Sequence, residues 1–145
     1  MEAVIFTGIQ ASGKSTFFRE RFFDTHLLLS LDLIGSRHIE KRILDLYIKY
    51  RKSFVVDNTN PTIADRARYI QRAKLAGYKI LGYYFETQIA SALKRNEARE
   101  GKKRIPPVGI RSMRNKLQMP GVGEGFDELY FVRIDESGFA VCREY

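Results

Sequence analysis

Short apolar segments alternate with longer amphipathic ones along the 145-residue chain. Continuous apolar runs rich in β-formers predict strands, and apolar residues three or four positions apart predict helices. The predicted strands are Ala3–Thr7, His26–Ser30, Phe54–Asp57, Lys79–Phe85 and Leu129–Ile134. The predicted helices are Lys14–Phe22, Ser36–Tyr50, Pro61–Ala76, Gln88–Glu100 and Val108–Leu117. This alternation is typical of an α/β fold, a parallel sheet with helices on both faces and ligands at the carboxyl ends of the strands.

Cap and turn residues predict where some of these elements end. Pro61 has the position expected of a first helical residue, with Asn60 before it as the N-cap. Gly77 lies where the same helix is expected to stop. The segment DESG at residues 135–138 predicts a turn, which adds a short terminal hairpin to the last strand.

Residues 6–18, FTGIQASGKSTFF, place the pattern G-x-x-x-x-G-K-[ST] between a predicted strand and a predicted helix. The pattern is typical of a P-loop, whose glycines let the backbone wrap around phosphate oxygens at a helix N-terminus. Lys14 is expected to reach the β- and γ-phosphates, and Ser15 to bind Mg²⁺. The cofactors predicted are therefore ATP and Mg²⁺. The expected ATP-binding residues of the loop are Gly8, Gln10, Ala11, Ser12, Gly13, Lys14, Ser15 and Thr16.

The second predicted strand is followed by a carboxylate, Asp32. A kinase that acts on a hydroxyl group benefits from a carboxylate that orients the hydroxyl and takes its proton. The end of the second strand faces the P-loop, so we expect Asp32 to be this base. The alternative is that Asp32 only caps the next helix or completes the turn.

The third predicted strand ends in FVVDNTNP, with Asp57 after three apolar residues. This is the Walker-B arrangement, in which the acid helps to hold Mg²⁺, so Ser15 and Asp57 are the predicted metal site. Asn58, Thr59 and Asn60 are expected to hydrogen-bond the sugar or phosphate of the acceptor, or to cap the helix at Pro61. A glutamate directly after Asp57, typical of ATP-driven motors, is absent, and so is the N-K-x-D motif of GTPase switches.

Composition predicts one domain, residues 1–145, because 44% hydrophobic residues in a chain of this length can form a substantial core. Cys142 is the single cysteine, which excludes internal disulfides and thiolate-rich metal sites. The first strand begins almost at Met1, which leaves no room for a signal peptide, and no apolar run is long enough for a membrane helix. We therefore expect a cytoplasmic protein without a membrane partner. The oligomeric state is left open.

The formal net charge of +8 is concentrated in one segment. Between Lys94 and Lys116 there are nine basic residues and two acidic ones. Three interpretations remain open for this segment: a solvated charged helix, a lid at about residues 94–107 that neutralises the phosphates of ATP, or a lid that also attracts a polyanionic acceptor such as nucleic acid.

Four segments together resemble the kinase domain of the polynucleotide 5′-kinase family, whose members phosphorylate the 5′-hydroxyl ends of DNA or RNA. They are GIQASGKSTF, DNTNPTIADRARYIQRAKLAG, LKRNEAREGKKRIPP and the EGF at residues 124–126. The resemblance runs from about residue 3 to residue 132. It implies a P-loop kinase fold with the parallel strands in the order 2-3-1-4-5, since spacing alone does not fix that order.

The resemblance also implies roles for individual residues. Lys14 and Ser15 match the phosphate- and magnesium-binding pair, and Asp32 matches the general base. Arg95 and Arg99 match lid arginines that stabilise charge on the transferred phosphoryl group. The expected catalytic residues are thus Lys14, Asp32, Arg95 and Arg99, and both lid arginines also bind ATP. The expected acceptor-binding residues are Asp32, Arg37, Asp57, Asn58 and Arg66, and a nucleic-acid strand could continue along Arg68, Arg104, Arg111 and Arg114.

The chain departs from the family at two positions. Leu31 stands where the family often has an arginine before the base. Gly35 stands where the phage member of the family has a basic residue. The leading hypothesis is ATP-dependent phosphoryl transfer to a 5′-hydroxyl end of DNA or RNA. The alternatives are a kinase for a nucleoside, sugar or antibiotic, and a non-catalytic ATP-binding module. Any 3′-end processing is expected to come from a separate phosphatase or ligase protein.

Overall fold

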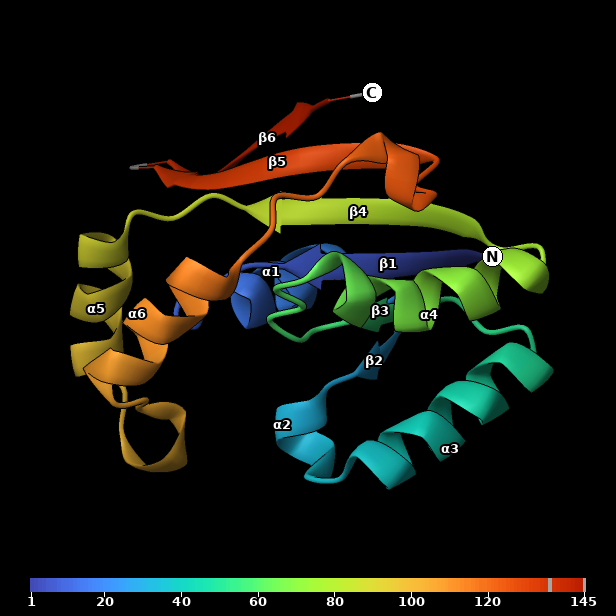
Figure 1. Ribbon diagram of the computed structural model, residues 1–145, viewed down its shortest axis with the longest axis horizontal. Coiled ribbons are helices and arrows are strands. Elements are labelled where there is room, and N and C mark those ends of the chain that lie inside the picture. Colours follow the sequence, from blue (N-terminus) through green and yellow to red (C-terminus); the bar gives the residue numbers. More distant parts are fainter. Residues whose placement is uncertain (136, 145) are drawn as a thin grey trace.

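A six-stranded sheet in the order β2-β3-β1-β4-β5-β6 runs through the computed structural model, which describes residues 1–135 and 137–144 (Figure 1). The strands are β1 Glu2–Thr7, β2 Leu27–Leu29, β3 Phe54–Val56, β4 Lys79–Phe85, β5 Glu128–Asp135 and β6 Gly138–Arg143. The first five pair in parallel, which confirms the predicted class and the order 2-3-1-4-5. β6 pairs antiparallel with β5 and forms the expected terminal hairpin; Glu136 of its predicted turn lies outside the described residues.

The helices cover both faces of this sheet. They are α1 Lys14–Arg21, α2 Leu31–Ile34, α3 Arg37–Lys49, α4 Ile63–Leu75, α5 Ile89–Glu97 and α6 Pro107–Lys116, with two short 3₁₀ turns, η1 Gly101–Lys103 and η2 Val122–Glu124. α5 and α6 lie beyond the carboxyl ends of the central strands, on the same side as α2 (Figure 1). The short helix α2 and the two 3₁₀ turns were not predicted. None of the described helices is long and apolar enough to cross a membrane.

Alternate residues of β1 supply the two halves of the core. Val4 and Phe6 pack toward α1, in a cluster with Phe17. Ala3 and Ile5 pack on the opposite face, where α3 and α4 lie. Because β1 is buried on both faces, it is a continuous apolar run instead of an alternating one. This central position holds the loop after β1 at the carboxyl edge of the sheet.

The N-terminus of α4 differs from the prediction. Its N-cap is Thr62, which forms a capping box with Asp65. Asn60 is not the cap: its backbone has φ 44°, and its side-chain amide donates to the Phe6 carbonyl oxygen at 2.8 Å. Asn60 thus joins the loop after β3 to the strand before the P-loop. The predicted stop at Gly77 is confirmed, since that residue follows the last turn with φ 83°.

Arg66 requires a correction, because the structure buries it completely. Its guanidinium forms a two-pronged ion pair with Glu124, with Nε to Oε1 at 2.8 Å and Nη2 to Oε2 at 3.1 Å. It also donates to the carbonyl oxygens of Asn60 and Pro61. Arg66 therefore fixes η2 and the loop after β3 to α4, and it presents no donor to an acceptor.

We expect Arg66→Ala to lower the free energy of unfolding by about 3–5 kcal/mol, because it leaves the Glu124 carboxylate buried without its partner. Urea unfolding of the purified variant measures this loss. Arg68→Ala, two residues away and exposed, is the matched control and should change stability by about 0.5 kcal/mol or less. Equal effects of the two substitutions would contradict a structural role specific to Arg66.

Candidate active site

The loop after β1 has the backbone geometry of an anion-binding turn. Gly13 has φ 93°, and a side chain there would collide with Ile134 and Phe139 of the terminal hairpin. Ala11 also has a positive φ, 61°, a conformation that costs a residue with a Cβ of order 1 kcal/mol and that is concentrated at functional sites. The loop leads directly into α1, which begins at Lys14 without a side-chain cap. The free N–H groups of its first turn therefore remain available to an anion.

Lys14 is buried inside the loop. Its ammonium donates to the carbonyl oxygens of Gly8 and Ile9 at 3.0 and 2.8 Å, and to Ser12 Oγ at 3.3 Å. Burial lowers the pKa of Lys14 to about 8, against the opposing attraction of Asp57 and Asp32. The lysine is thus cationic at neutral pH, although burial disfavours its charge.

Ser15 and Asp57 meet, in agreement with the metal site predicted from the P-loop and the Walker-B position. Ser15 Oγ donates to Asp57 Oδ2 at 2.7 Å, although the two residues lie 42 positions apart. Burial raises the pKa of Asp57, and the nearby Lys14 and the Ser15 hydrogen bond act in the opposite direction. A hydroxyl and a carboxylate at the start of a phosphate-binding helix supply the oxygen ligands that Mg²⁺ prefers. These two residues therefore fit a magnesium ion.

Asp32 lies in the first turn of α2, exposed, and makes no hydrogen bond to any described residue. Ser30 is the N-cap of α2, and Ser36 is the N-cap of α3. The alternative role of Asp32 as a helix cap therefore finds no support in the geometry. Its charge acts on both Lys14 and Asp57, so the carboxylate lies within electrostatic reach of the phosphate-binding loop.

Asn58 positions the backbone next to Asp32. Its Oδ1 accepts from the Leu31 backbone N–H at 2.8 Å, and its Nδ2 donates to Glu40 Oε2 at 2.9 Å and to the Tyr69 hydroxyl at 3.1 Å. Both ends of the amide are thus used within the protein. Asn58 was expected to contact the acceptor, but the geometry gives its side chain a positioning role.

Glu40 is the centre of this network and was missed by the sequence reasoning. It is only 2% exposed, and its Oε1 accepts from the Tyr69 hydroxyl at 2.9 Å and from Arg37 at 3.1 Å. Burial raises the pKa of Tyr69, and the adjacent Glu40 carboxylate adds to the rise. The sequence gives no signal that this glutamate is buried, because two of its partners, Tyr69 and Asn58, come from α4 and from the loop after β3.

A cavity of about 150 Å³ lies between α2 and the P-loop. Its walls include three predicted site residues: Asp32, Arg37 and Asn58. Gln10, from the P-loop, and Ile105, from the segment after α5, line it as well. Arg66 does not line the cavity. Asp65 of the α4 capping box also lines it, so two carboxylate residues and one exposed arginine surround a space of small-molecule size beside the phosphate-binding loop.

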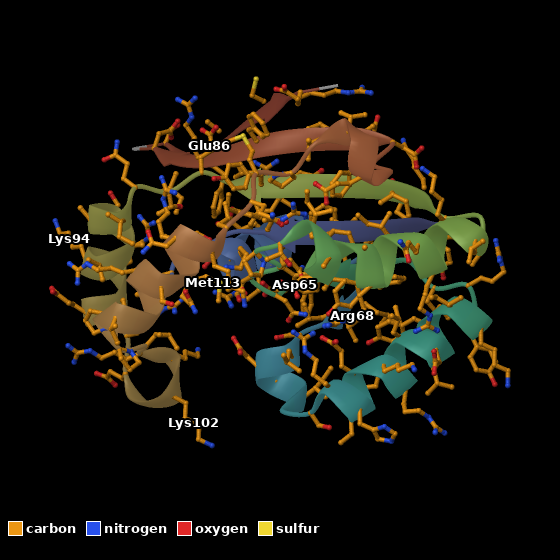
Figure 2. All side chains as sticks on the ribbon, in the orientation of Figure 1. Asp65, Arg68, Glu86, Lys94, Lys102 and Met113 are labelled. Atoms are coloured by element: carbon orange, nitrogen blue, oxygen red, sulfur yellow. The ribbon has the colours of Figure 1, made fainter. Side chains whose placement is uncertain are left out.

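The predicted lid corresponds to the end of α5, η1 and the segment that leads to α6. Its base is packed: Ala92 of α5 and Ile110 of α6 form a buried cluster with Ile9 and Ala11 of the P-loop. Arg95 Nε donates to the Ala11 carbonyl oxygen at 2.7 Å, and burial, with a contribution from Arg99, lowers its pKa. Lys102 lies at the far tip of this segment (Figure 2).

Arg99 donates to the Lys103 carbonyl oxygen at 3.1 Å, within the same segment. Its positive charge adds to the lowering of the pKa of Lys14, which burial mainly causes. Approach of Arg99 to a γ-phosphate after lid closure stays a prediction.

Comparisons with known proteins agree with this fold. A family model described as an AAA domain matches residues 35–120, more than half of the chain. The bifunctional polynucleotide phosphatase/kinase of Schizosaccharomyces pombe is 27% identical over 148 residues, which cover 99% of this chain and 35% of that protein. The chain thus spans about a third of the length of this curated relative.

Two solved structures show how far the likeness in fold extends. An unliganded sugar kinase from Janibacter sp. HTCC2649 has a TM-score of 0.71 at 15% identity, covering 92% of this chain and 85% of that chain. Kti12 of Chaetomium thermophilum, solved with ADP-AlF3, has a TM-score of 0.64 at 16% identity, covering 93% of this chain and 92% of that chain. The fold is that of the P-loop kinases, and it implies nucleotide binding.

We expect ATP affinity to fall as pH rises above about 8, because the free protein's Lys14 is cationic below that pKa and neutral above it. The affinity should decline by up to tenfold per pH unit between pH 8 and 9.5. Calorimetric titration with a non-hydrolysable ATP analogue measures the change. Lys14→Arg keeps its charge throughout this range and should bind more weakly but with a flat pH response. An equal decline in both proteins would exclude Lys14 as the titrating group.

Proposed function

The chain belongs to the AAA-domain family, and on that premise we propose that it is an ATP-dependent kinase that phosphorylates the 5′-hydroxyl end of a polynucleotide. The observation that carries the proposal is the position of Asp32, unpaired among the described residues, in a cavity that adjoins the P-loop. A cavity of this kind suits an acceptor hydroxyl that must lie between a proton acceptor and the terminal phosphate of ATP.

The residues divide the chemistry among them. The loop backbone and the α1 N-terminus bind the phosphates, and Lys14 neutralises charge that develops on the transferred group. Ser15 and Asp57 would hold Mg²⁺, which supplies further neutralisation of the phosphates. Asp32 orients the acceptor hydroxyl and takes its proton. Arg95 and Arg99 add positive charge from the lid. Arg99 acts once the lid has closed.

A second cavity supports a polynucleotide acceptor. It has a volume of about 330 Å³ and lies between α3 and α4. Four basic side chains line it: Arg37, Lys41, Arg68 and Arg72. Figure 2 shows Arg68 between the two helices. Because Arg37 lines both cavities, the basic surface continues from the cavity that holds Asp32.

Not all of these cations are equally available to phosphodiesters. Arg72 pairs with Asp45, and Arg37 pairs with Glu40 while half of its side chain stays exposed. Lys41 and Arg68 form no ion pair with a described acidic residue. They are therefore the side chains best able to bind backbone phosphates upstream of the reacting end. The S. pombe relative, a polynucleotide phosphatase/kinase, supports the same acceptor class.

A small-molecule acceptor is the second candidate. The cavity beside Asp32 is small, and Leu31, which lines it, stands where the sequence resemblance would imply an arginine. Two small-molecule kinases share the fold: the Janibacter sugar kinase, with a TM-score of 0.71, and a gluconokinase from Sinorhizobium meliloti, with a TM-score of 0.65. A panel of nucleosides and sugars alongside 5′-hydroxyl oligonucleotides separates the two candidates.

We expect Asp32→Asn to lower turnover by about 10²-fold or more while ATP affinity stays within a few-fold, because the amide cannot accept the hydroxyl proton. Transfer of labelled phosphate from ATP, together with a separate ATP titration, measures both quantities. Full turnover in the Asp32→Asn protein would remove Asp32 from the mechanism.

We expect affinity for a 5′-hydroxyl single strand to fall with salt, with a log–log slope of about −0.7 for each phosphate contacted. Arg68→Gln and Lys41→Gln should each make the slope shallower by about that amount. Lys52→Gln is the matched control and should not change the slope. Lys52 is an exposed lysine just before β3, at the amino ends of the strands. Titration in the presence of a non-hydrolysable ATP analogue gives the slopes. A flat salt response in the wild-type protein would favour the small-molecule acceptor.

A further inference from the structure

The partners of Asn58 leave a single orientation open to its side-chain amide. Its Oδ1 accepts from the Leu31 N–H, whereas its Nδ2 donates to Glu40 Oε2 and to the Tyr69 hydroxyl. A backbone N–H can only donate and a carboxylate can only accept, so the two ends of the amide cannot exchange places. The carboxylate of Glu40 therefore decides which atom Asn58 presents to Leu31.

The Leu31 N–H is the point where this network reaches the backbone of Asp32. Leu31 is the first residue of α2, and the first N–H groups of a helix have no partner within the helix. The N-cap, Ser30, provides no side-chain hydrogen bond, so Asn58 Oδ1 supplies the partner from outside the helix. Asp32 is the next residue, and its own side chain makes no hydrogen bond to a described residue. The amide of Asn58 is thus what holds the first turn of α2 in place.

Glu40 acts on this turn from a distance. It belongs to α3 and lines the second cavity, the one between α3 and α4. Asn58 and Leu31 line the cavity beside Asp32, and Glu40 does not. An effect of Glu40 on the reacting hydroxyl must therefore pass through the Asn58 amide, because the two groups share no cavity.

We propose that Glu40 is a positioning residue for phosphoryl transfer: it orients the Asn58 amide, and the amide holds the turn that carries Asp32. The inference rests on the proposed function in one respect, the role of Asp32 as the base. It does not depend on which acceptor the base serves. Glu40 is buried, touches neither ATP nor the reacting hydroxyl, and acts through the direction of one hydrogen bond.

Glu40→Gln tests this direction, because it keeps the shape of the side chain and replaces one acceptor oxygen with an NH2 donor. The other oxygen accepts from the charged Arg37 and from the Tyr69 hydroxyl, so the new NH2 group is expected on the side of Asn58. There it meets Asn58 Nδ2, a second donor. The Asn58 amide then turns its oxygen toward position 40, and the Leu31 N–H loses its acceptor.

Amide hydrogen exchange followed by NMR reads the Leu31 N–H without ATP or an acceptor. Glu40→Gln should speed exchange at this N–H by about tenfold or more relative to the rest of the chain. The double variant Glu40→Gln/Asn58→Asp exchanges the carboxylate and the amide, so an oxygen at position 58 again accepts from the Leu31 N–H. Exchange there should return to within about threefold of the wild-type rate. Unchanged exchange in Glu40→Gln, or no recovery in the double variant, would overturn the proposal.

Turnover shows whether this orientation matters for the chemistry. In Glu40→Gln, kcat should fall about 10- to 100-fold because the base is misplaced, while the KM for ATP stays within about twofold. The double variant should regain most of the lost kcat. An effect through the second cavity would instead raise the acceptor KM alone, and position 58, which does not line that cavity, would not rescue it. That result would overturn the proposal.

Glu2→Gln is the matched control for these measurements. Glu2 is the first residue of β1, at the opposite end of the strand from the P-loop, and its Oε1 lies 2.8 Å from His26 Nε2. The same exchange of carboxylate for amide should leave kcat and Leu31 exchange unchanged there. A lower thermal midpoint with unchanged kcat in Glu40→Gln would give Glu40 a purely structural role, and would also overturn the proposal.

The outcome is separable from that of the proposed function. If the wild-type protein phosphorylates a nucleoside or sugar and no oligonucleotide, the polynucleotide function fails, and the same comparison of kcat runs on that compound. If Glu40→Gln does not fold, the double variant decides alone. Wild-type protection of the Leu31 N–H with kcat close to that of the wild type then supports the inference. Loss of either, or failure of the double variant to fold, overturns it.

Discussion

The side-chain amide of Asn58 holds the acceptor side of the site together. It bonds at one end to the Leu31 N–H and at the other to Glu40 and Tyr69. The short helix that carries Asp32 has no side-chain cap and no buried residue of its own, so it depends on this amide. The position of the backbone next to Asp32 is therefore set by Asn58 of the loop after β3, which Glu40 of α3 and Tyr69 of α4 hold in turn. The buried Glu40 gives the amide a fixed acceptor. A carboxylate is tolerated in this core because it accepts these hydrogen bonds.

The phosphate side of the site departs from what stability alone would favour. Ala11 has a backbone conformation that suits glycine, Lys14 is charged in a buried position, and Gln10 has an oxygen without a partner. Each of these features costs free energy in the free protein. The conformation of the loop and the buried charge of Lys14 are those expected of a site that binds phosphates. Such local conflicts are expected where a fold is shaped for a ligand.

The sequence predicted the features that depend on local pattern. The P-loop, the strand order and the Ser15–Asp57 pair follow from motifs and from a family resemblance that covers most of the chain. The sequence did not give the full role of three residues, Asn60, Asn58 and Arg66, because their hydrogen-bond partners are distant in the sequence. Arg66 meets Glu124 across 58 positions, and Asn58 meets Leu31 across 27. A buried arginine and a surface arginine look alike in one sequence, and only packing distinguishes them.

The lid and the acceptor cavity are also joined through the chain itself. Just after α6, Gln118 N–H donates to the Pro61 carbonyl oxygen at 2.6 Å, and Gln118 Oε1 accepts from Ile63 N–H at 2.8 Å. The C-terminal end of the α5–α6 unit is thus fixed to the loop after β3, while its base is fixed to Ile9 and Ala11 of the P-loop. Closure that moved the whole unit would break both attachments. The part of the unit without any buried residue is η1. Ile105, which follows η1 and lines the cavity beside Asp32, is held to α5 by two hydrogen bonds with the buried Asn96, at 2.5 and 2.8 Å. A closure that leaves these attachments intact is therefore confined to η1 and its flanks, and the wall that Ile105 supplies keeps its place.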